Sequence, residues 1–283
     1  MFTKTLASAS PDYERDSIIL NEEEPKESQR FRNCLSEVRK LAQKSQNKNT
    51  VERSAWKVHI VSSNSFPTKA GLASSASGYA CLGTFKLINY SNDTCIKLTG
   101  IYRQIYFLVY TLAQLYELDA SGSDLSALAR RGSGSACRSL FGGFVRWYME
   151  DPCIARPIAC ANHWPDLRCM VAVVSTGTKS VGSTEGMRRS VQTSTLLQHR
   201  IDKVLPNRIE GMQQAILERN FERFAELSMK DSNQFHAVCL DTYPPLFYLN
   251  GTSNAIIQLV HLYNQVHQKI KVKTMIRIFV IYF

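Results

Sequence analysis

The chain has 283 residues, of which 44% are hydrophobic and 20% charged, proportions typical of a folded protein with one large or two modest domains. Its net charge of +10 favours anionic partners, but no recognisable nucleic-acid module is present, so we expect no nucleic-acid partner. The 8 cysteines contain no Cys-x-x-Cys pair, and the apolar runs are too short to span a bilayer. We therefore expect no protein-held metal cluster, no membrane contact and a cytosolic location.

The first part of the chain mixes helical and strand patterns. Residues 1–25 are polar and offer little for a core, whereas residues 31–42 have the apolar spacing of a helix and residues 56–62 alternate like a strand. Residues 83–109 are rich in Ile, Tyr, Phe, Asn and Lys and show no clear period. Further predicted elements are helices over residues 110–118 and 124–131 and a strand over residues 144–149.

The second part is mainly helical. An apolar run over residues 167–175 predicts a buried strand. The predicted helices cover residues 184–198, 206–218, 221–230 and 253–268, with Ser253 as a cap for the last. Strands and helices do not alternate strictly, so the pattern predicts an α+β fold in two lobes, residues 1–165 and 166–283.

The most informative segment reads Pro67-Thr-Lys-Ala-Gly-Leu-Ala-Ser-Ser-Ala-Ser-Gly78. Small side chains let backbone N–H groups approach an anion, and a helix N-terminus just after them adds aligned donors. A Ser/Ala-rich helix start packed against a sheet would show the same composition. The Gly-Lys-Ser/Thr ending of a Walker loop is absent.

The order of proline, short spacer and Gly-Leu-Ala-Ser-Ser-Ala resembles the phosphate-binding motif of the GHMP small-molecule kinase superfamily. The string Ala-Ser-Ser-Ala-Ser-Gly-Tyr-Ala is similar to its decarboxylase branch in particular. The resemblance assigns the ATP phosphates to Gly71, Leu72, Ala73, Ser74, Ser75, Ala76 and Ser77.

A second glycine-rich segment reads Arg130-Arg-Gly-Ser-Gly-Ser-Ala-Cys-Arg-Ser-Leu-Phe-Gly-Gly143. Hydroxyls, backbone donors and a fixed guanidinium suit a carboxylate or diphosphate, although a flexible turn would also be rich in glycine and serine. The whole string closely resembles the signature of diphosphomevalonate decarboxylases. The strings around Thr184, His236 and Pro244 also match that family, and Arg30 falls where the family has an arginine for the substrate diphosphate.

The resemblance implies a two-lobed GHMP-kinase fold, with a ribosomal-protein-S5-domain-2-like N-terminal lobe and a ferredoxin-like C-terminal lobe. It implies ATP- and Mg²⁺-dependent decarboxylation of mevalonate 5-diphosphate to isopentenyl diphosphate by a homodimer. Arg138 is the expected catalytic residue, because its guanidinium would hold the substrate carboxylate. The expected substrate-binding residues are Arg30, Ser133, Gly134, Ser135, Ala136, Cys137, Arg138 and Thr184.

The sequence departs from the family in three places. It lacks the initial Lys-Tyr-Trp-Gly-Lys strand and the late Asp-Ala-Gly-Pro-Asn segment with the expected catalytic base, and residues 83–109 intervene within the match. Translated intron would explain residues 83–109 and 273–283. We therefore expect a truncated chain with little or no turnover. The alternatives are an inactive isoform that binds or dimerises with a partner, and another GHMP small-molecule kinase.

Overall fold

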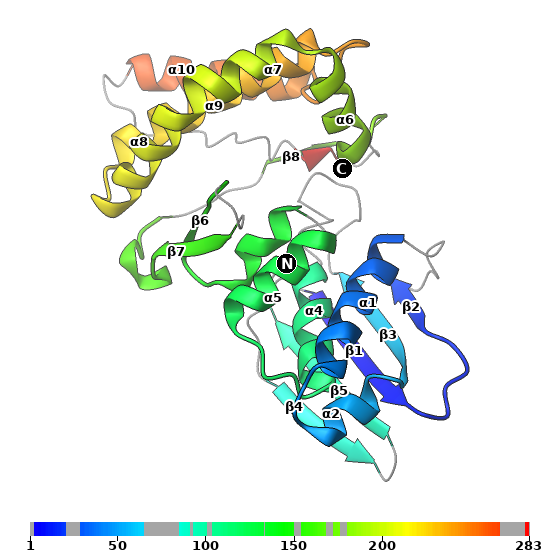
Figure 1. Ribbon diagram of the computed structural model, residues 1–283. Coiled ribbons are helices and arrows are strands. Elements are labelled where there is room, and N and C mark those ends of the chain that lie inside the picture. Colours follow the sequence, from blue (N-terminus) through cyan, green and yellow to red (C-terminus); the bar gives the residue numbers. More distant parts are fainter. Residues whose placement is uncertain are drawn as a thin grey trace. The chain divides into compact units, whose positions relative to one another are not determined.

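The computed structural model describes residues 3–20, 29–64, 85–90, 93–100, 104–132, 134–149, 154–167, 172–175, 180–266 and 281–282. The chain forms two compact units, which are described separately here: residues 1–68 with 73–157, and residues 69–72 with 158–283 (Figure 1). Helices and strands occur in both units, as the composition and spacing predicted.

A five-stranded sheet forms the base of the first unit, in the order β2-β3-β1-β5-β4 (Figure 1). Its strands are β1 (Thr3–Ser10), β2 (Ser17–Leu20), β3 (Lys57–Asn64), β4 (Phe85–Tyr90) and β5 (Asp93–Gly100). β2 runs parallel to β3, and the other neighbours are antiparallel. β1 therefore has a hydrogen-bonded partner on each side.

One sequence prediction for this sheet was wrong, and one segment without a predicted element forms strands. Residues 1–25 were expected to add little to a core, yet Ala7 and Ala9 of β1 are each only 1% exposed. Their methyl groups carry little apolar signal, but they allow helices to pack closely on the strand. Residues 83–109 showed no period, yet the structure forms β4 and β5 there, because strand pairing supplies order that local spacing did not indicate.

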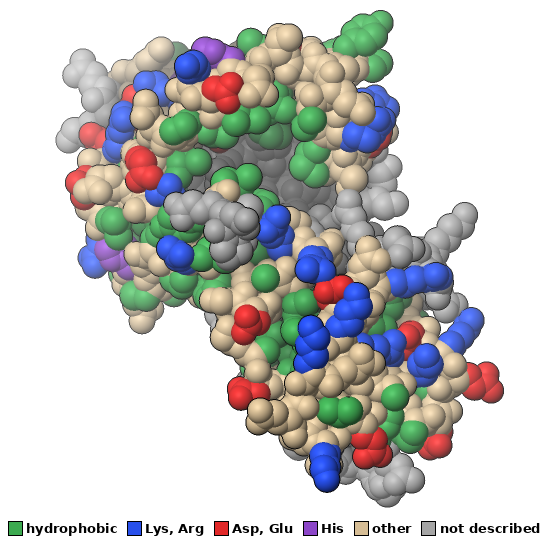
Figure 2. Space-filling model, viewed as in Figure 1, with side chains coloured by type: hydrophobic (Ala, Val, Ile, Leu, Met, Phe, Trp, Pro, Cys, Tyr) green, Lys and Arg blue, Asp and Glu red, His purple; other side chains and the backbone are tan. Residues whose placement is uncertain are grey.

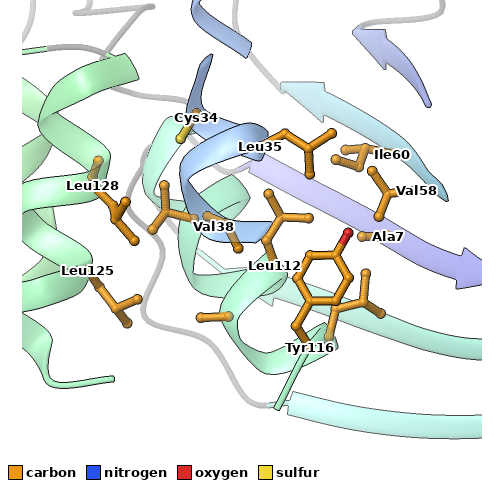
Figure 3. Close-up of a cluster of buried hydrophobic side chains, with 14 of the residues drawn as sticks. Ala7, Cys34, Leu35, Val38, Val58, Ile60, Leu112, Tyr116, Leu125 and Leu128 are labelled. Atoms are coloured by element: carbon orange, nitrogen blue, oxygen red, sulfur yellow. The ribbon is translucent and has the colours of Figure 1, made fainter. Parts of the chain in front are cut away.

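Three helices and this sheet enclose a core of buried hydrophobic side chains (Figure 3). The helices are α1 (Gln29–Gln43), α4 (Gln104–Leu115) and α5 (Gly122–Gly132), while the short α2 (Lys48–Arg53) follows α1. The buried positions of α1 are spaced by three and four residues: Phe31, Cys34, Leu35, Val38 and Ala42. This spacing places them on one helix face, as predicted.

A half-buried cluster, here called the Arg39 cluster, links four segments of the first unit. The Arg39 guanidinium donates to both carboxylate oxygens of Asp16, at 2.8 and 2.7 Å, and to the carbonyl oxygen of Trp56 at 2.7 Å. Its Nε donates to the hydroxyl of Tyr116 at 3.2 Å, and Asp16 also accepts from the backbone N–H of Val58 at 2.9 Å. The fork geometry of arginine therefore joins α1 to strands and to the end of α4.

The second unit is mostly helical. Its elements are η2 (Ala161–His163), β8 (Val173–Ser175), α6 (Ser183–Thr193), α7 (Thr195–His199), η3 (Arg200–Val204), α8 (Leu205–Leu217), α9 (Phe221–Asp241), α10 (Gly251–Val266) and β9 (Ile281–Tyr282). β8 and β9 pair in parallel. The predicted helices in this region are confirmed, with boundaries that differ by a few residues at most places.

Three features of these helices differ from the predictions. The helix predicted over residues 184–198 divides at Ser194, whose hydroxyl caps α7 by accepting from Leu197 N and donates to Asp241. α9 continues to Asp241 instead of ending at residue 230. Ser253 lies inside α10, and Asn250 provides the capping oxygen, accepting from the backbone N–H and the hydroxyl of Ser253.

No helix in the described ranges has both the length and the apolar character that a bilayer crossing requires.

Candidate functional site

The predicted phosphate-binding segment lies outside the described residues. This applies to all of its members, Gly71, Leu72, Ala73, Ser74, Ser75, Ala76 and Ser77. Their assignment to ATP stays a prediction.

The predicted substrate segment has a defined conformation. Residues Gly134–Leu140 form a 3₁₀ helix, η1, after α5, in place of the flexible turn that was the alternative interpretation of this segment. Ser126 of α5 donates its hydroxyl to the carbonyl oxygen of Cys137 at 2.8 Å in a buried hydrogen bond. The Cys137 thiol donates in turn to the carbonyl oxygen of Gly134 at 3.1 Å. The segment is thus held from α5 and by its own thiol.

The thiol of Cys137 is buried at 1% exposure. Burial raises the pKa of this thiol, and the nearby Arg138 and Arg130 charges reduce that rise only in part. The group therefore stays protonated near neutral pH and acts as a hydrogen-bond donor within η1, not as a nucleophile. Ala136 is also fully buried, so it contributes to the core rather than presenting a side chain to a ligand.

Arg138 and Gly134 both lie beside Trp147 of β6 (Phe144–Trp147), which pairs with β7 (Ala155–Ala159). The guanidinium carbon of Arg138 lies 6.0 Å from the centre of the Trp147 ring. A Cβ atom added to Gly134 would lie 3.2 Å from Cη2 of the same ring. The indole ring of Trp147 therefore lies beside Gly134, at the start of η1, and beside Arg138.

The remaining predicted substrate residues are described in part. Ser133 lies outside the described residues, and only the backbone of Ser135 and of Arg30, the second residue of α1, is described. Thr184 is exposed in the first turn of α6, in the second unit. The N-cap residue of this helix is Gly182, which has no side chain to cap it, and Glu185 in the first turn accepts from Arg188 and Arg189.

The structure brings Gly134, Ala136, Cys137 and Arg138 together within one helical segment. Their side chains divide by role, since two face the core and Arg138 is partly exposed. Sequence reasoning missed Ser126 and Trp147. No spacing signal could have found either residue, because each meets the segment through tertiary packing of α5 or β6.

A separate hollow of about 590 Å³ lies beside α1 and the β1–β2 connection. Basic side chains outnumber acidic ones along its lining, which includes Arg15, Arg32 and Lys57. Figure 2 shows Lys and Arg side chains across the face of this unit, with Asp and Glu among them. The predicted site residues whose side chains the structure describes, among them Arg138 and Thr184, do not line this hollow.

Groups of three or more His, Cys, Asp or Glu side chains with the geometry of a metal site are absent from the described part of the chain.

Comparison with known families gives two matches that together cover most of the chain. The "Diphosphomevalonate decarboxylase-like N-terminal domain" matches residues 1–104 and 107–155. The "Mevalonate 5-diphosphate decarboxylase C-terminal domain" matches residues 169–274. Each half of the chain therefore matches the corresponding half of one family.

Curated relatives agree with these matches. The chain is 48% identical over 279 residues to the diphosphomevalonate decarboxylase of Danio rerio, covering 95% of this chain and 62% of that protein. It is 47% identical over 280 residues to the Homo sapiens enzyme, covering 95% and 63%. The chain thus spans a little over three fifths of the length of these relatives.

Solved structures show the same fold. A crystal structure of mevalonate 5-diphosphate decarboxylase, 42% identical, superposes with a TM-score of 0.77 over 95% of this chain and 64% of that one. The Trypanosoma brucei enzyme, 33% identical, also gives 0.77 over 95% and 64%. A structure titled as a complex with MVAPP, AMPPCP and magnesium, 25% identical, gives 0.66 over 95% and 84%. The predicted α+β fold of this superfamily is confirmed.

Proposed function

The chain belongs to the diphosphomevalonate decarboxylase family, and from this premise we propose that it carries out ATP-dependent decarboxylation of mevalonate 5-diphosphate to isopentenyl diphosphate. The observation that carries the proposal is the ordered η1 segment, in which buried Cys137 fixes the backbone that presents Arg138. The complex of the 25% identical relative with MVAPP, AMPPCP and magnesium supports the same pair of ligands.

Arg138 is the proposed catalytic residue. Its planar guanidinium can hold a carboxylate through two parallel hydrogen bonds, which fixes the orientation of the carboxylate relative to the bond that breaks. Because η1 is already ordered by Ser126 and Cys137, little reorganisation is needed when charge develops. We assign substrate contacts to Arg30, Ser133, Gly134, Ser135 and Thr184 as part of the same proposal.

The substrate and ATP are both polyanions, so the site must offset their repulsion. The proposal places the ATP phosphates at Gly71 and the residues that follow it, up to Ser77, where backbone N–H donors would surround them. Mg²⁺ would neutralise charge on the transferring phosphate. This ion retains several waters and is held mainly through substrate phosphates, so a complete protein cage is not required.

The position of Thr184 at the start of a helix suits the binding of an anion. Thr184 lies in the first turn of the 11-residue helix α6, where the positive end of the helix dipole favours an anion. The negative charge of Glu185 in the same turn is offset, because Arg188 and Arg189 both donate to its carboxylate. These hydrogen bonds lower the pKa of Glu185 to about 2, so the carboxylate stays ionised within this pair of arginines.

We also propose that the chain is divided into two lobes, residues 1–165 and 166–283, and that it forms a homodimer. Exposed apolar side chains on α10, among them Leu259 at 64% and Val266 at 68%, support an interface on the second unit. Sedimentation at two protein concentrations tests the dimer, which predicts twice the monomer mass at the higher one.

The test of function is release of phosphate from ATP that depends on mevalonate 5-diphosphate, with ligand binding measured in parallel by calorimetry. We expect Arg138→Gln to reduce kcat/KM by about 10²- to 10³-fold, as for the loss of a charged transition-state contact. Arg53→Gln is the control, because Arg53 pairs with Glu117 and has no place in the site. Substrate binding without coupled phosphate release would refute the proposed catalysis and agree with the low turnover expected from the sequence. Absence of binding as well would refute the proposed site.

No observation favours the alternatives. Matches to decarboxylase domains in both halves of the chain argue against another small-molecule kinase. An inactive isoform would carry the same matches, so the assay above separates it from the enzyme.

A further inference from the structure

We propose that Trp147 is a positioning residue that sets the orientation of Arg138 and the conformation of the η1 segment. This inference rests on the proposed function of Arg138. It concerns a residue on β6, outside the motif by which the segment was identified.

The first observation is the contact between Trp147 and Arg138. The guanidinium carbon lies 6.0 Å from the ring centre, at the outer range of a cation–π contact. Arginine has a long side chain with many rotamers, and holding it in one direction has an entropic cost. An aromatic face beside the guanidinium lowers that cost without itself occupying an N–H donor.

The second observation is the approach of Trp147 to Gly134. A Cβ atom at position 134 would lie 3.2 Å from Cη2 and 3.8 Å from Cζ3 of the indole. The first distance is tighter than ordinary van der Waals contact, so a side chain at position 134 would require the ring or the backbone to shift by a few tenths of an ångström. The benzo edge of Trp147 therefore leaves little room for a side chain at the start of η1, while its ring lies beside Arg138.

The third observation concerns the indole N–H group of Trp147. Trp147 Nε1 is buried and meets no hydrogen-bond acceptor in the described part of the chain. The ring itself, not a hydrogen bond, thus makes the contacts with Gly134 and Arg138. Phenylalanine would keep an aromatic face but lose the larger ring, whereas leucine would lose the aromatic face altogether.

The same segment is held from the other side by α5. Ser126 donates to the Cys137 carbonyl oxygen at 2.8 Å, so η1 lies between a hydrogen bond from α5 and an aromatic contact from β6. Side chains supplied by regular elements hold a binding group more precisely than a loop does. Trp147 is therefore placed where it can position Arg138 without touching the substrate.

The test compares the unaltered chain with Trp147→Phe and Trp147→Leu. The first readout is the Arg138 Nε–H resonance, assigned with Arg138→Lys, whose chemical shift reports the ring current of the neighbouring indole. The second is the Kd for mevalonate 5-diphosphate and, separately, for a non-hydrolysable ATP analogue. Trp164→Phe is the matched control, since Trp164 packs edge-on against Phe221 and Phe224 in the second unit.

We expect Trp147→Leu to displace the Arg138 resonance and to raise the Kd for mevalonate 5-diphosphate about 3- to 30-fold, the range of a cation–π contact. Trp147→Phe, which is the milder change if the leucine variant folds poorly, should retain part of the shift and weaken binding less. The ATP analogue should bind within about twofold in every variant, and Trp164→Phe should change neither readout.

Two results would overturn the inference. One is an Arg138 resonance that stays in place in both Trp147 variants. The other is a displaced resonance with substrate affinity unchanged within about twofold. If the unaltered chain binds no mevalonate 5-diphosphate, the proposed function fails, and the resonance alone then decides whether Trp147 positions Arg138.

Discussion

Replacing Asp16 by asparagine removes the negative charge from the Arg39 cluster while keeping the shape of the side chain. In the folded protein the Asp16 carboxylate accepts two hydrogen bonds from Arg39 and one from Val58 N–H. The side chains of Arg39 and Asp16 are 18% and 24% exposed, so water can replace only part of what is lost. An unpaired Arg39 charge would remain in this half-buried position.

The size of the effect follows from these contacts. Breaking a fully buried ion pair costs about 3–5 kcal/mol, and a hydrogen bond to a charged group contributes about 1.5–3 kcal/mol. Asparagine can still accept from Val58 and offers one oxygen to Arg39. We therefore expect Asp16→Asn to lower the free energy of unfolding of the first unit by about 2–3 kcal/mol near neutral pH.

The effect should depend on pH in a definite direction. Burial by itself would raise the pKa of the Asp16 carboxyl, but hydrogen bonds from Arg39 and Val58 outweigh it and hold the pKa below its usual value of 3.8. A depressed carboxyl pKa contributes stability above the unfolded-state pKa, and this contribution is lost as the pH falls through the folded-state pKa. The difference between the two proteins should therefore shrink below about pH 4.

The assay is urea-induced unfolding read by hydrogen exchange in peptides from α1 and β3, which reports this unit separately from the other. Lys40→Gln on the same helix is the control, because Lys40 forms an exposed pair with Glu37 and should leave the midpoint unchanged. A cost below about 0.5 kcal/mol at neutral pH, or an equal cost in acid, would contradict the assigned role of Asp16.

Three further predictions follow from local packing. Gly186→Ala places a Cβ atom against the Tyr248 hydroxyl, so we expect a loss of about 1–2 kcal/mol in unfolding free energy, measured by urea titration. A thiol reagent should label exposed Cys160 before buried Cys34, whose pKa burial raises to about 12, as peptide mass spectrometry would show. Ser126→Ala should cost about 1–2 kcal/mol and weaken substrate binding, measured by calorimetry, because a buried carbonyl loses its donor.

Each of these predictions has a control or a contrary outcome. Gly251→Ala matches Gly186→Ala, because nothing lies within 4 Å of its added Cβ, and it should leave stability unchanged. Labelling of Cys34 at the rate of Cys160 would contradict the burial of the former. A Ser126→Ala protein with unaltered substrate affinity would show that the hydrogen bond to Cys137 does not order η1 for binding.

Much of the architecture could be predicted from local spacing. The helix α1 followed from apolar residues such as Leu35 and Val38 at helical intervals, and the helices α8 and α9 were predicted in the same way. β1 could not be predicted, because its buried residues Ala7 and Ala9 are small and alternate with polar residues that resemble a linker. β5 was missed because its order comes from pairing with β1.

The sequence by itself determined the family and named the substrate segment, since the order of residues in a motif is a local property. Only the tertiary structure showed that Trp147 borders Gly134 and Arg138, and that Arg39 meets Tyr116, a residue 77 positions away. Such contacts depend on which faces of helices and strands pack together. Packing brings together side chains whose separation along the chain has no period, so spacing could not predict them.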